Sequence, residues 1–239
     1  MSKLSQLLEA QELDLGSDRL SERRRNLPER ESLRLSQLRA GELDEAHRQL
    51  GVRREQLDQA EHTLVDEVAT IARKAKEVED TLYGGTVRSS KELTGLQEEL
   101  RQLREKQSGL EEREMALLEE IEQVGRDTEA NRADLEQCDR ETRAIEAALK
   151  AAEAEIDAEL AQLAAQRKDK VADLPAAIVA EYDRLRGRDK LAGRPAALLV
   201  DGECGGCRVK LPVLEYNRMK AKPEDTLLTC PRCARVLVR

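Results

Sequence analysis

The chain has 239 residues, and 38 % of them are Asp, Glu, Lys or Arg, whereas its aromatic residues are three Tyr with no Trp or Phe. Because aromatic side chains supply much of the buried area of a compact core, this composition argues against one large globular domain and against the catalytic architectures that need one. The net charge of −8 is unevenly distributed. Residues 188–239 carry eleven Lys or Arg against six Asp or Glu, and the preceding residues carry a net charge of −13. A polyanion would therefore be attracted to the C-terminal segment alone.

The N-terminal residues predict neither a leader nor a membrane anchor. Polar and acidic side chains follow Met1 too closely for a signal peptide, and no stretch approaches the roughly 20 apolar residues of a membrane span. We therefore expect a cytoplasmic protein without membrane contact. Thiols stay reduced in the cytoplasm, so the five Cys are interpreted as metal ligands or packing groups before disulfides.

Two long heptad patterns dominate the first three quarters of the chain. The second pattern runs from Leu93 to Ile156, and the first keeps an uninterrupted spacing of seven through Leu43, Leu50, Leu57, Leu64, Ile71 and Val78. A mean apolar spacing of 3.5 keeps one stripe facing a partner helix, so each pattern indicates a coiled-coil helix. Cys138 falls on the second stripe, where we expect a small buried side chain and not a further metal ligand.

The segment between the two patterns predicts a reversal of the chain. Gly84-Gly85 would stop the first helix, and Ser89 with Glu92 three residues later forms a capping box that starts the second. The two helices are therefore expected to form an antiparallel hairpin whose tip lies at about residues 83–90.

The register of the hairpin predicts its extent. If paired positions sum to about 174, Leu64 meets Leu110 and the N-terminus meets the region before Pro175, where a proline would end the returning helix. The hairpin would then span residues 1–172, with a kink near Pro28. Because the apolar stripe before Pro28 is irregular, we expect this end of the hairpin to be the looser one.

The remaining residues predict a linker and a small β-rich segment. Residues 173–190 read as a connecting helix and linker, because three apolar side chains share one helical face before Gly187. Residues 191–239 contain short apolar runs typical of strands, which flank two cysteine motifs, and a segment of helical composition from Pro212 to Lys222.

The cysteines of the C-terminal segment carry the most specific chemical signal. Cys204, Cys207, Cys230 and Cys233 form two Cys-x2-Cys motifs with 22 residues between them. Two such tight turns can complete a tetrahedron of thiolates about 2.3 Å from zinc, and four protein ligands leave no position for a catalytic water. We predict one structural Zn2+ in a C4 zinc ribbon over residues 191–239, although spacing alone leaves iron open. The ribbon has too little core to fold alone, so we expect it to need the metal and the hairpin not to need it.

Together these patterns predict a mostly α protein, a long antiparallel coiled-coil helical hairpin with a small C-terminal β-rich zinc ribbon. The chain resembles the bacterial C4-type zinc-ribbon proteins with an N-terminal coiled coil. The resemblance covers essentially the whole chain and rests on the residues that open the second helix, Ser89-Ser90-Lys91-Glu92-Leu93, and on Asp201-Gly202-Glu203-Cys204-Gly205-Gly206-Cys207 with Cys230-Pro231-Arg232-Cys233. Ser89-Ser90 stands where family members often carry Asn-Pro.

The resemblance implies a regulator or adaptor and not an enzyme. Members of that family are described as candidate nucleic-acid-binding proteins, and some as adaptors or chaperones in flagellar or type III secretion systems. The residues agree, because no paired carboxylates, nucleophile–base set or phosphate loop can be placed on a cleft. We expect no small-molecule substrate.

Our first functional hypothesis is that the ribbon binds RNA or DNA. Its basic side chains would neutralise phosphates and release counterions, and the candidates are Arg208, Lys210, Arg218, Lys220, Lys222, Arg232 and Arg235. Two observations weigh against it. A zinc–thiolate centre would reduce the net charge of residues 188–239 from +5 to +3, and Tyr216 is the only aromatic side chain of the ribbon that could stack on a base.

The alternative hypothesis is a protein–protein adaptor or chaperone-like scaffold with no nucleic-acid binding. The hairpin would then act as a spacer, and its tip and the ribbon would be separate docking surfaces for a protein partner. The candidate residues at the tip are Tyr83, Val87 and Arg88.

Overall fold

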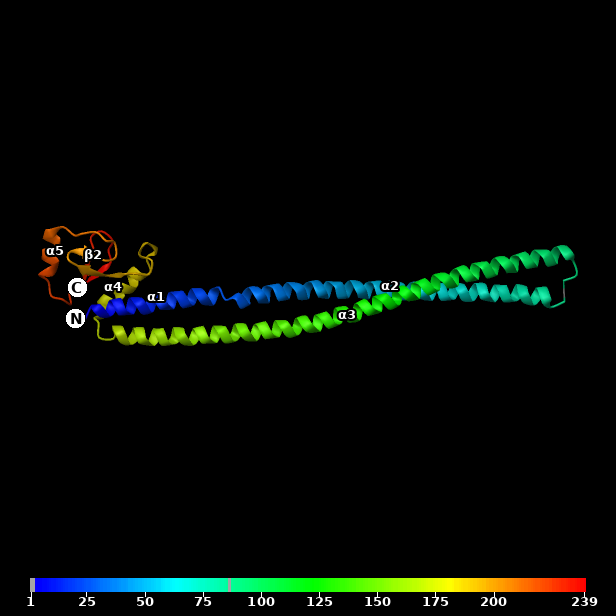
Figure 1. Cartoon of the computed structure of the whole chain (residues 1–239), viewed down its shortest axis with the longest axis horizontal. Coiled ribbons are helices and arrows are strands. Elements are labelled where there is room, and N and C mark those ends of the chain that lie inside the picture. Colours follow the sequence, from blue (N-terminus) through cyan, green and yellow to red (C-terminus); the bar gives the residue numbers. More distant parts are fainter. Residues whose placement is uncertain (1–2, 86) are drawn as a thin grey trace. The chain divides into compact units, whose positions relative to one another are not determined.

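The computed structural model describes residues 3–85 and 87–239. The helices are α1 (Ser5–Arg25), α2 (Pro28–Tyr83), α3 (Ser90–Val171), α4 (Ala176–Arg186), the 3-10 turn η1 (Asp189–Leu191) and α5 (Val213–Lys220). The strands are β1 (Ala196–Val200), β2 (Glu203–Cys204), β3 (Leu228–Thr229) and β4 (Val236–Val238). The predicted fold class, a long helical hairpin followed by a small β-rich segment, is confirmed (Figure 1).

The chain forms two compact units. The first unit, which we call the base unit, consists of Met1–Glu31 and Glu146–Arg239, and the second, the arm unit, consists of Ser32–Ile145. The base unit thus includes both ends of the hairpin together with the segment expected to be the ribbon. The predicted domain boundaries at 172/173 and 190/191 do not coincide with this division and stay a prediction.

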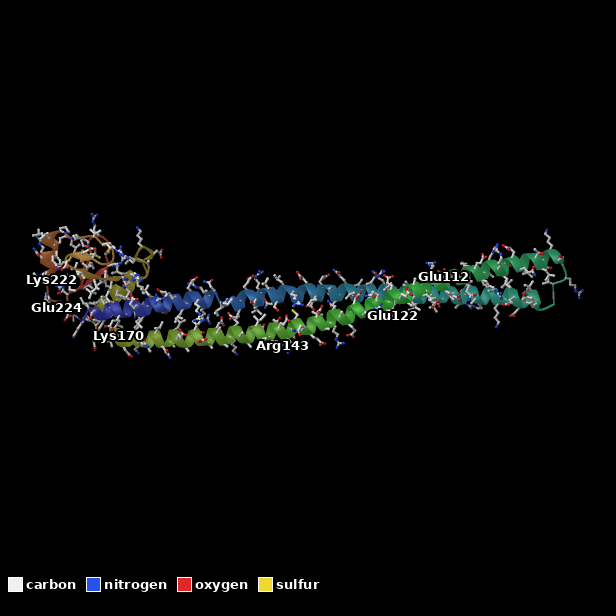
Figure 2. All side chains as sticks on the ribbon, viewed as in Figure 1. Glu112, Glu122, Arg143, Lys170, Lys222 and Glu224 are labelled. Atoms are coloured by element: carbon white, nitrogen blue, oxygen red, sulfur yellow. The ribbon has the colours of Figure 1, made fainter. Side chains whose placement is uncertain are left out.

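In the arm unit, α2 and α3 run alongside each other (Figure 1). They pack along a narrow apolar seam. Leu64, Ile71 and Leu110 are buried in one cluster, with Leu103 partly buried against it, as the predicted register requires. The outward faces are charged, and Figure 2 shows Glu112, Glu122 and Arg143 projecting from α3.

A polar layer interrupts the seam of the arm unit. The buried Asn131 donates from Nδ2 to the Leu43 carbonyl at 3.2 Å, and its Oδ1 lies 3.2 Å from Nδ1 of His47. Two turns along α3, Cys138 is only 1 % exposed. Its burial agrees with the expectation of a packing residue, and its sulfur lies 3.6 Å from the Ser36 carbonyl.

The reversal between the arms occurs where the glycines predict it. Helix α2 ends at Tyr83, and the Gly84 amide donates to the Asp80 carbonyl at 2.8 Å. A Cβ on Gly84 would lie 2.7 Å from that oxygen, and Gly85 has φ +75°, a conformation that favours glycine. Helix α3 begins at Ser90, directly after the predicted cap Ser89. Thr86, within the predicted tip, lies outside the described residues.

In the base unit the first arm is interrupted at Pro28. Helix α1 ends at Arg25 and α2 begins at Pro28, which as the first residue of a helix needs no backbone hydrogen-bond donor. The expectation that the N-terminal end would be loose is wrong. Leu4 and Leu7 are among the most completely buried side chains, because they pack against α4 and the C-terminal sheet as well as against α3.

The sheet of the base unit has the strand order β2-β1-β4-β3. Strands β1 and β4 are parallel, with Ala196 opposite Val236, and the outer pairs β1–β2 and β3–β4 are antiparallel. One side of the sheet contributes Ala196, Val236 and Val238 to the core around Leu7. The other side forms a second core that contains cysteines and is covered by Tyr216 and Met219 of α5.

Candidate metal centre

The two cysteine motifs have the same backbone hydrogen-bond pattern. At the first motif, the Arg208 amide donates to the Cys204 carbonyl at 2.7 Å, and the Cys204 amide donates to Val209 at 3.1 Å. At the second motif, Ala234 donates to Cys230 at 2.8 Å, and Cys230 donates to Arg235 at 2.9 Å. Each motif is therefore a tight knuckle held between short extended segments.

The knuckles bring the four cysteine sulfurs together. All four lie within 4.8 Å of one another, with Sγ–Sγ distances of 3.9 Å for Cys204–Cys233 and 3.8 Å for Cys207–Cys230. Four sulfurs bound at 2.3 Å to one tetrahedral zinc are about 3.8 Å apart. Cys204 and Cys230 are buried, and Cys207 and Cys233 are half-buried. The set has the size and closed surroundings of a structural zinc site.

The metal-free thiols differ in acidity. Burial raises the pKa of Cys204, and burial raises the pKa of Cys230 to about 12. Burial also opposes ionisation of Cys233, but hydrogen bonds from the backbone and side chain of Arg235, together with those from Cys230 and Cys207, outweigh it and lower the pKa of Cys233 to about 7. Zinc binds thiolates, so metal uptake at neutral pH must release protons from this site.

Arg235 is part of the support of this centre. Its Nε donates to the Arg194 carbonyl at 2.7 Å, and its Nη2 lies 3.3 Å from the Leu191 carbonyl. The side chain crosses Gly206, where an added Cβ would lie 2.4 Å from Cδ of Arg235. The sequence suggested Arg235 as a phosphate contact, but the structure commits its guanidinium to the protein's own backbone.

The other six basic candidates are exposed. Within the described part of the chain, none of their side chains takes part in an ion pair. Figure 2 shows the labelled Lys222 at the surface of the base unit. These six residues, which we call the ribbon cations, are Arg208, Lys210, Arg218, Lys220, Lys222 and Arg232.

The tip candidates belong to the arm unit and have different environments. Tyr83 is 75 % exposed at the end of α2, Arg88 is exposed, and Val87 is half-buried. The cysteines and the ribbon cations belong to the base unit.

Two exposed aliphatic residues were not among the predicted site residues. Val213 and Leu214 open α5 and are 75 % and 65 % exposed, whereas Tyr216 and Met219 of the same helix face inward. The signal was present in the sequence, since only one face of so short a helix can be covered. Tyr216 itself is half-buried over Gly202, 3.4 Å from the position of an added Cβ.

The comparisons with known proteins agree with the fold and with the centre. Residues 10–190 match the CT398-like coiled coil hairpin domain, and residues 204–237 match the C4-type zinc ribbon domain. Both descriptions name structural domains and not enzymes. The family match and the clustered sulfurs together support one structural zinc ion. In the described residues, no helix combines the length and the apolar character needed to cross a membrane.

Individual relatives cover nearly the whole chain. An uncharacterized protein of Mycobacterium tuberculosis is 28 % identical over 98 % of this chain and 94 % of its own length. A solved structure from Mycobacterium smegmatis has a TM-score of 0.76 and 25 % identity, and covers 100 % of both chains. The structure of CT398 from Chlamydia trachomatis has a TM-score of 0.66 at 19 % identity, over 99 % of this chain and 97 % of that one, which supports the fold alone.

Proposed function

Because the chain belongs to the CT398-like coiled coil hairpin domain family and ends in a C4-type zinc ribbon, we propose that it is a non-enzymatic adaptor whose ribbon binds nucleic acid. In this proposal Cys204, Cys207, Cys230 and Cys233 hold the zinc. The ion has a structural role, because four protein ligands leave no coordination position for a substrate or a water. The ion would hold the two knuckles together, and the ribbon's own side chains would make the contacts with nucleic acid.

The observation that carries the proposal is the set of ribbon cations. Six exposed Lys and Arg side chains with no ion-pair partner in the described chain are available to phosphates. The half-buried Tyr216 offers little surface for stacking on a base. We therefore propose contact with the phosphate backbone and little discrimination between base sequences.

The test is a salt titration on the full-length, zinc-loaded protein. Fluorescent oligonucleotides of one sequence, as single-stranded RNA, single-stranded DNA and duplex DNA, are titrated at several salt concentrations. The logarithm of the binding constant should fall linearly with the logarithm of salt, with a slope of about −0.7 per phosphate contact for single strands and about −0.9 for duplex DNA.

Matched charge removals complete this test. Arg232→Gln and Lys210→Gln should each weaken binding and reduce the slope by about one contact. Lys106→Gln removes an exposed lysine of α3 in the arm unit and should leave both quantities unchanged. No binding at low salt, or a slope near zero, would contradict the proposal.

The second candidate is an adaptor that binds only proteins, and Val213 and Leu214 favour it. Two neighbouring aliphatic side chains this exposed on one small segment are suited to an apolar protein contact. A partner recovered from nuclease-treated extract by the wild type and lost with Leu214→Glu would select this candidate. Leu118→Glu, at a 44 % exposed leucine of α3, is the control, and Tyr83→Ser tests whether the tip contributes.

A further inference from the structure

Helix α1 and the residue before it are held in the base unit by two sets of contacts, which meet at Tyr182 of α4. The first set joins the N-terminal part of α1 to the sheet. Leu4 and Leu7 share a core with Val236 and Val238 of β4 and with side chains of α4. The Ala196 amide of β1 donates to Oε1 of Gln11 at 2.9 Å. Gln11 is itself buried, so this hydrogen bond has no competing water.

The second set joins the later turns of α1 to α3 and α4. Oδ1 of the buried Asp14 accepts from Nε of Arg167 at 2.9 Å, and its Oδ2 accepts from the Tyr182 hydroxyl at 2.8 Å. One turn further, Asp18 accepts from Arg186 at 2.6 Å. Arg167 also lies over the Tyr182 ring, 5.8 Å from its centroid. No strand takes part in these contacts.

The strands that cover the first set depend on the knuckles. Cys204 lies in β2 opposite Leu199 of β1, and the Gly205 amide donates to the Leu198 carbonyl at 2.8 Å. Strand β4 begins three residues after Cys233. Strands of two to five residues have little stability of their own, so their order depends on the cross-link that an ion provides.

We propose that zinc in the ribbon controls the order of residues 4–11. Loss of the ion disorders the sheet and releases these residues with Leu4 and Leu7, while residues 14–25 stay in place through Asp14 and Asp18. The zinc-free protein then presents an apolar surface that the zinc-bound protein buries. This inference does not depend on nucleic-acid binding and extends the role of the metal from the ribbon to the hairpin.

Hydrogen exchange followed by mass spectrometry tests the proposal on the full chain. The protein is compared with zinc bound and after removal of zinc by a chelator. Peptides covering residues 4–11 should exchange at least tenfold faster without zinc, together with the ribbon peptides. Peptides covering 14–25, and those of the arm unit over 57–117, should keep their protection.

Three results would overturn the proposal. Residues 4–11 could remain protected while the ribbon peptides lose protection, or protection could be lost to the same degree along the whole of α1. Retained protection of the ribbon after zinc removal would equally contradict it, because the strands would then not need the ion. Cys204→Ser provides a zinc-deficient protein without a chelator and should reproduce the pattern.

Two variants separate the two sets of contacts. Gln11→Ala removes the hydrogen bond to β1 and should speed exchange over residues 4–11 even with zinc bound. Asp14→Asn weakens the second set and should extend the zinc-free loss of protection through residues 14–25. Identical exchange profiles for these two variants would show that α1 opens as one piece and would contradict the two-part description.

Discussion

Left-handed backbone at the knuckles distinguishes Arg208 and Ala234 from their neighbours. They occupy equivalent positions, each directly after the second cysteine of its motif, with φ of 57° and 61°. A side chain in this region costs about 1 kcal/mol, which glycine avoids. Arg208 therefore occupies a strained backbone position that glycine would fit better. Its exposed guanidinium, as a proposed phosphate contact, gives a reason for arginine at this position.

Paired glycine substitutions separate strain from charge. Arg208→Gly and Ala234→Gly should both leave the ribbon as stable as before or stabilise it by up to about 1 kcal/mol, because each relieves a left-handed side chain. Only Arg208→Gly should weaken nucleic-acid binding and its salt dependence. Thermal unfolding and the oligonucleotide titration measure the two effects. Equal affinity of the two variants would remove Arg208 from the proposed contacts.

The buried carboxylate of Asp14 should contribute more to the free energy of unfolding than any surface charge of α1. Asp14→Asn weakens charge-assisted hydrogen bonds from Arg167 and Tyr182 and should destabilise the base unit by roughly 2–3 kcal/mol. Glu9→Gln removes an exposed ion pair with Lys170 and should change stability by less than about 0.5 kcal/mol. Urea denaturation followed by tyrosine fluorescence measures both, since Tyr182 and Tyr216 lie in this unit.

Residues differ in how far their roles could be predicted from the sequence. The cysteines could be assigned as ligand candidates because a Cys-x2-Cys turn is a local pattern whose geometry is set within four residues. Asp14 could not be singled out, because nothing near it in the sequence distinguishes it from Asp18. Its burial comes from partners as far as 168 positions away. The sequence predicts Arg235 only as an exposed cation suited to phosphate. Its hydrogen bonds to the Leu191 and Arg194 carbonyls depend on the tertiary fold, so no local pattern reveals them.

At the scale of elements, the coiled-coil arms were the most predictable part of the chain. Their heptads repeat, so each turn gives the same information about the seam, and Gly84-Gly85 mark the reversal. The same heptad reasoning does not predict the packing of the N-terminal turns. Leu4 and Leu7 pack against α3, α4 and the sheet together, and such surroundings impose no 3.5-residue period. The irregular apolar spacing therefore predicts a loose end where the structure has a buried one.

Two glycines in the hairpin should respond to alanine with opposite signs. Gly84→Ala forces a Cβ against the Asp80 carbonyl and should destabilise the arm unit by about 1 kcal/mol or more. Gly109→Ala places a Cβ in open space within α3 and should stabilise it by about 0.5–1 kcal/mol. Thermal melts followed by far-ultraviolet circular dichroism compare the two variants. A stabilising Gly84→Ala would show that the turn does not need glycine there.

At the scale of the whole molecule, metal binding and the N-terminal helix should influence each other reciprocally. If zinc orders residues 4–11, then weakening their packing must weaken zinc binding by linkage. Leu7→Ala should therefore speed transfer of zinc to a chromophoric chelator several-fold. Leu64→Ala removes a buried leucine from the arm unit and should leave the transfer rate unchanged. Equal rates for both variants would contradict the linkage.

The sequence separation of Gln11 and Ala196 has a consequence for biosynthesis. These two hydrogen-bonded residues are 185 positions apart, so at 5–20 residues per second the ribosome makes the second roughly 10 to 40 s after the first. Throughout that interval the nascent N-terminal helix lacks its final cover, and Leu4 and Leu7 stay accessible to factors that bind emerging chains. Closure of the base unit consequently has to wait until the cysteine knuckles have been made and have left the exit tunnel.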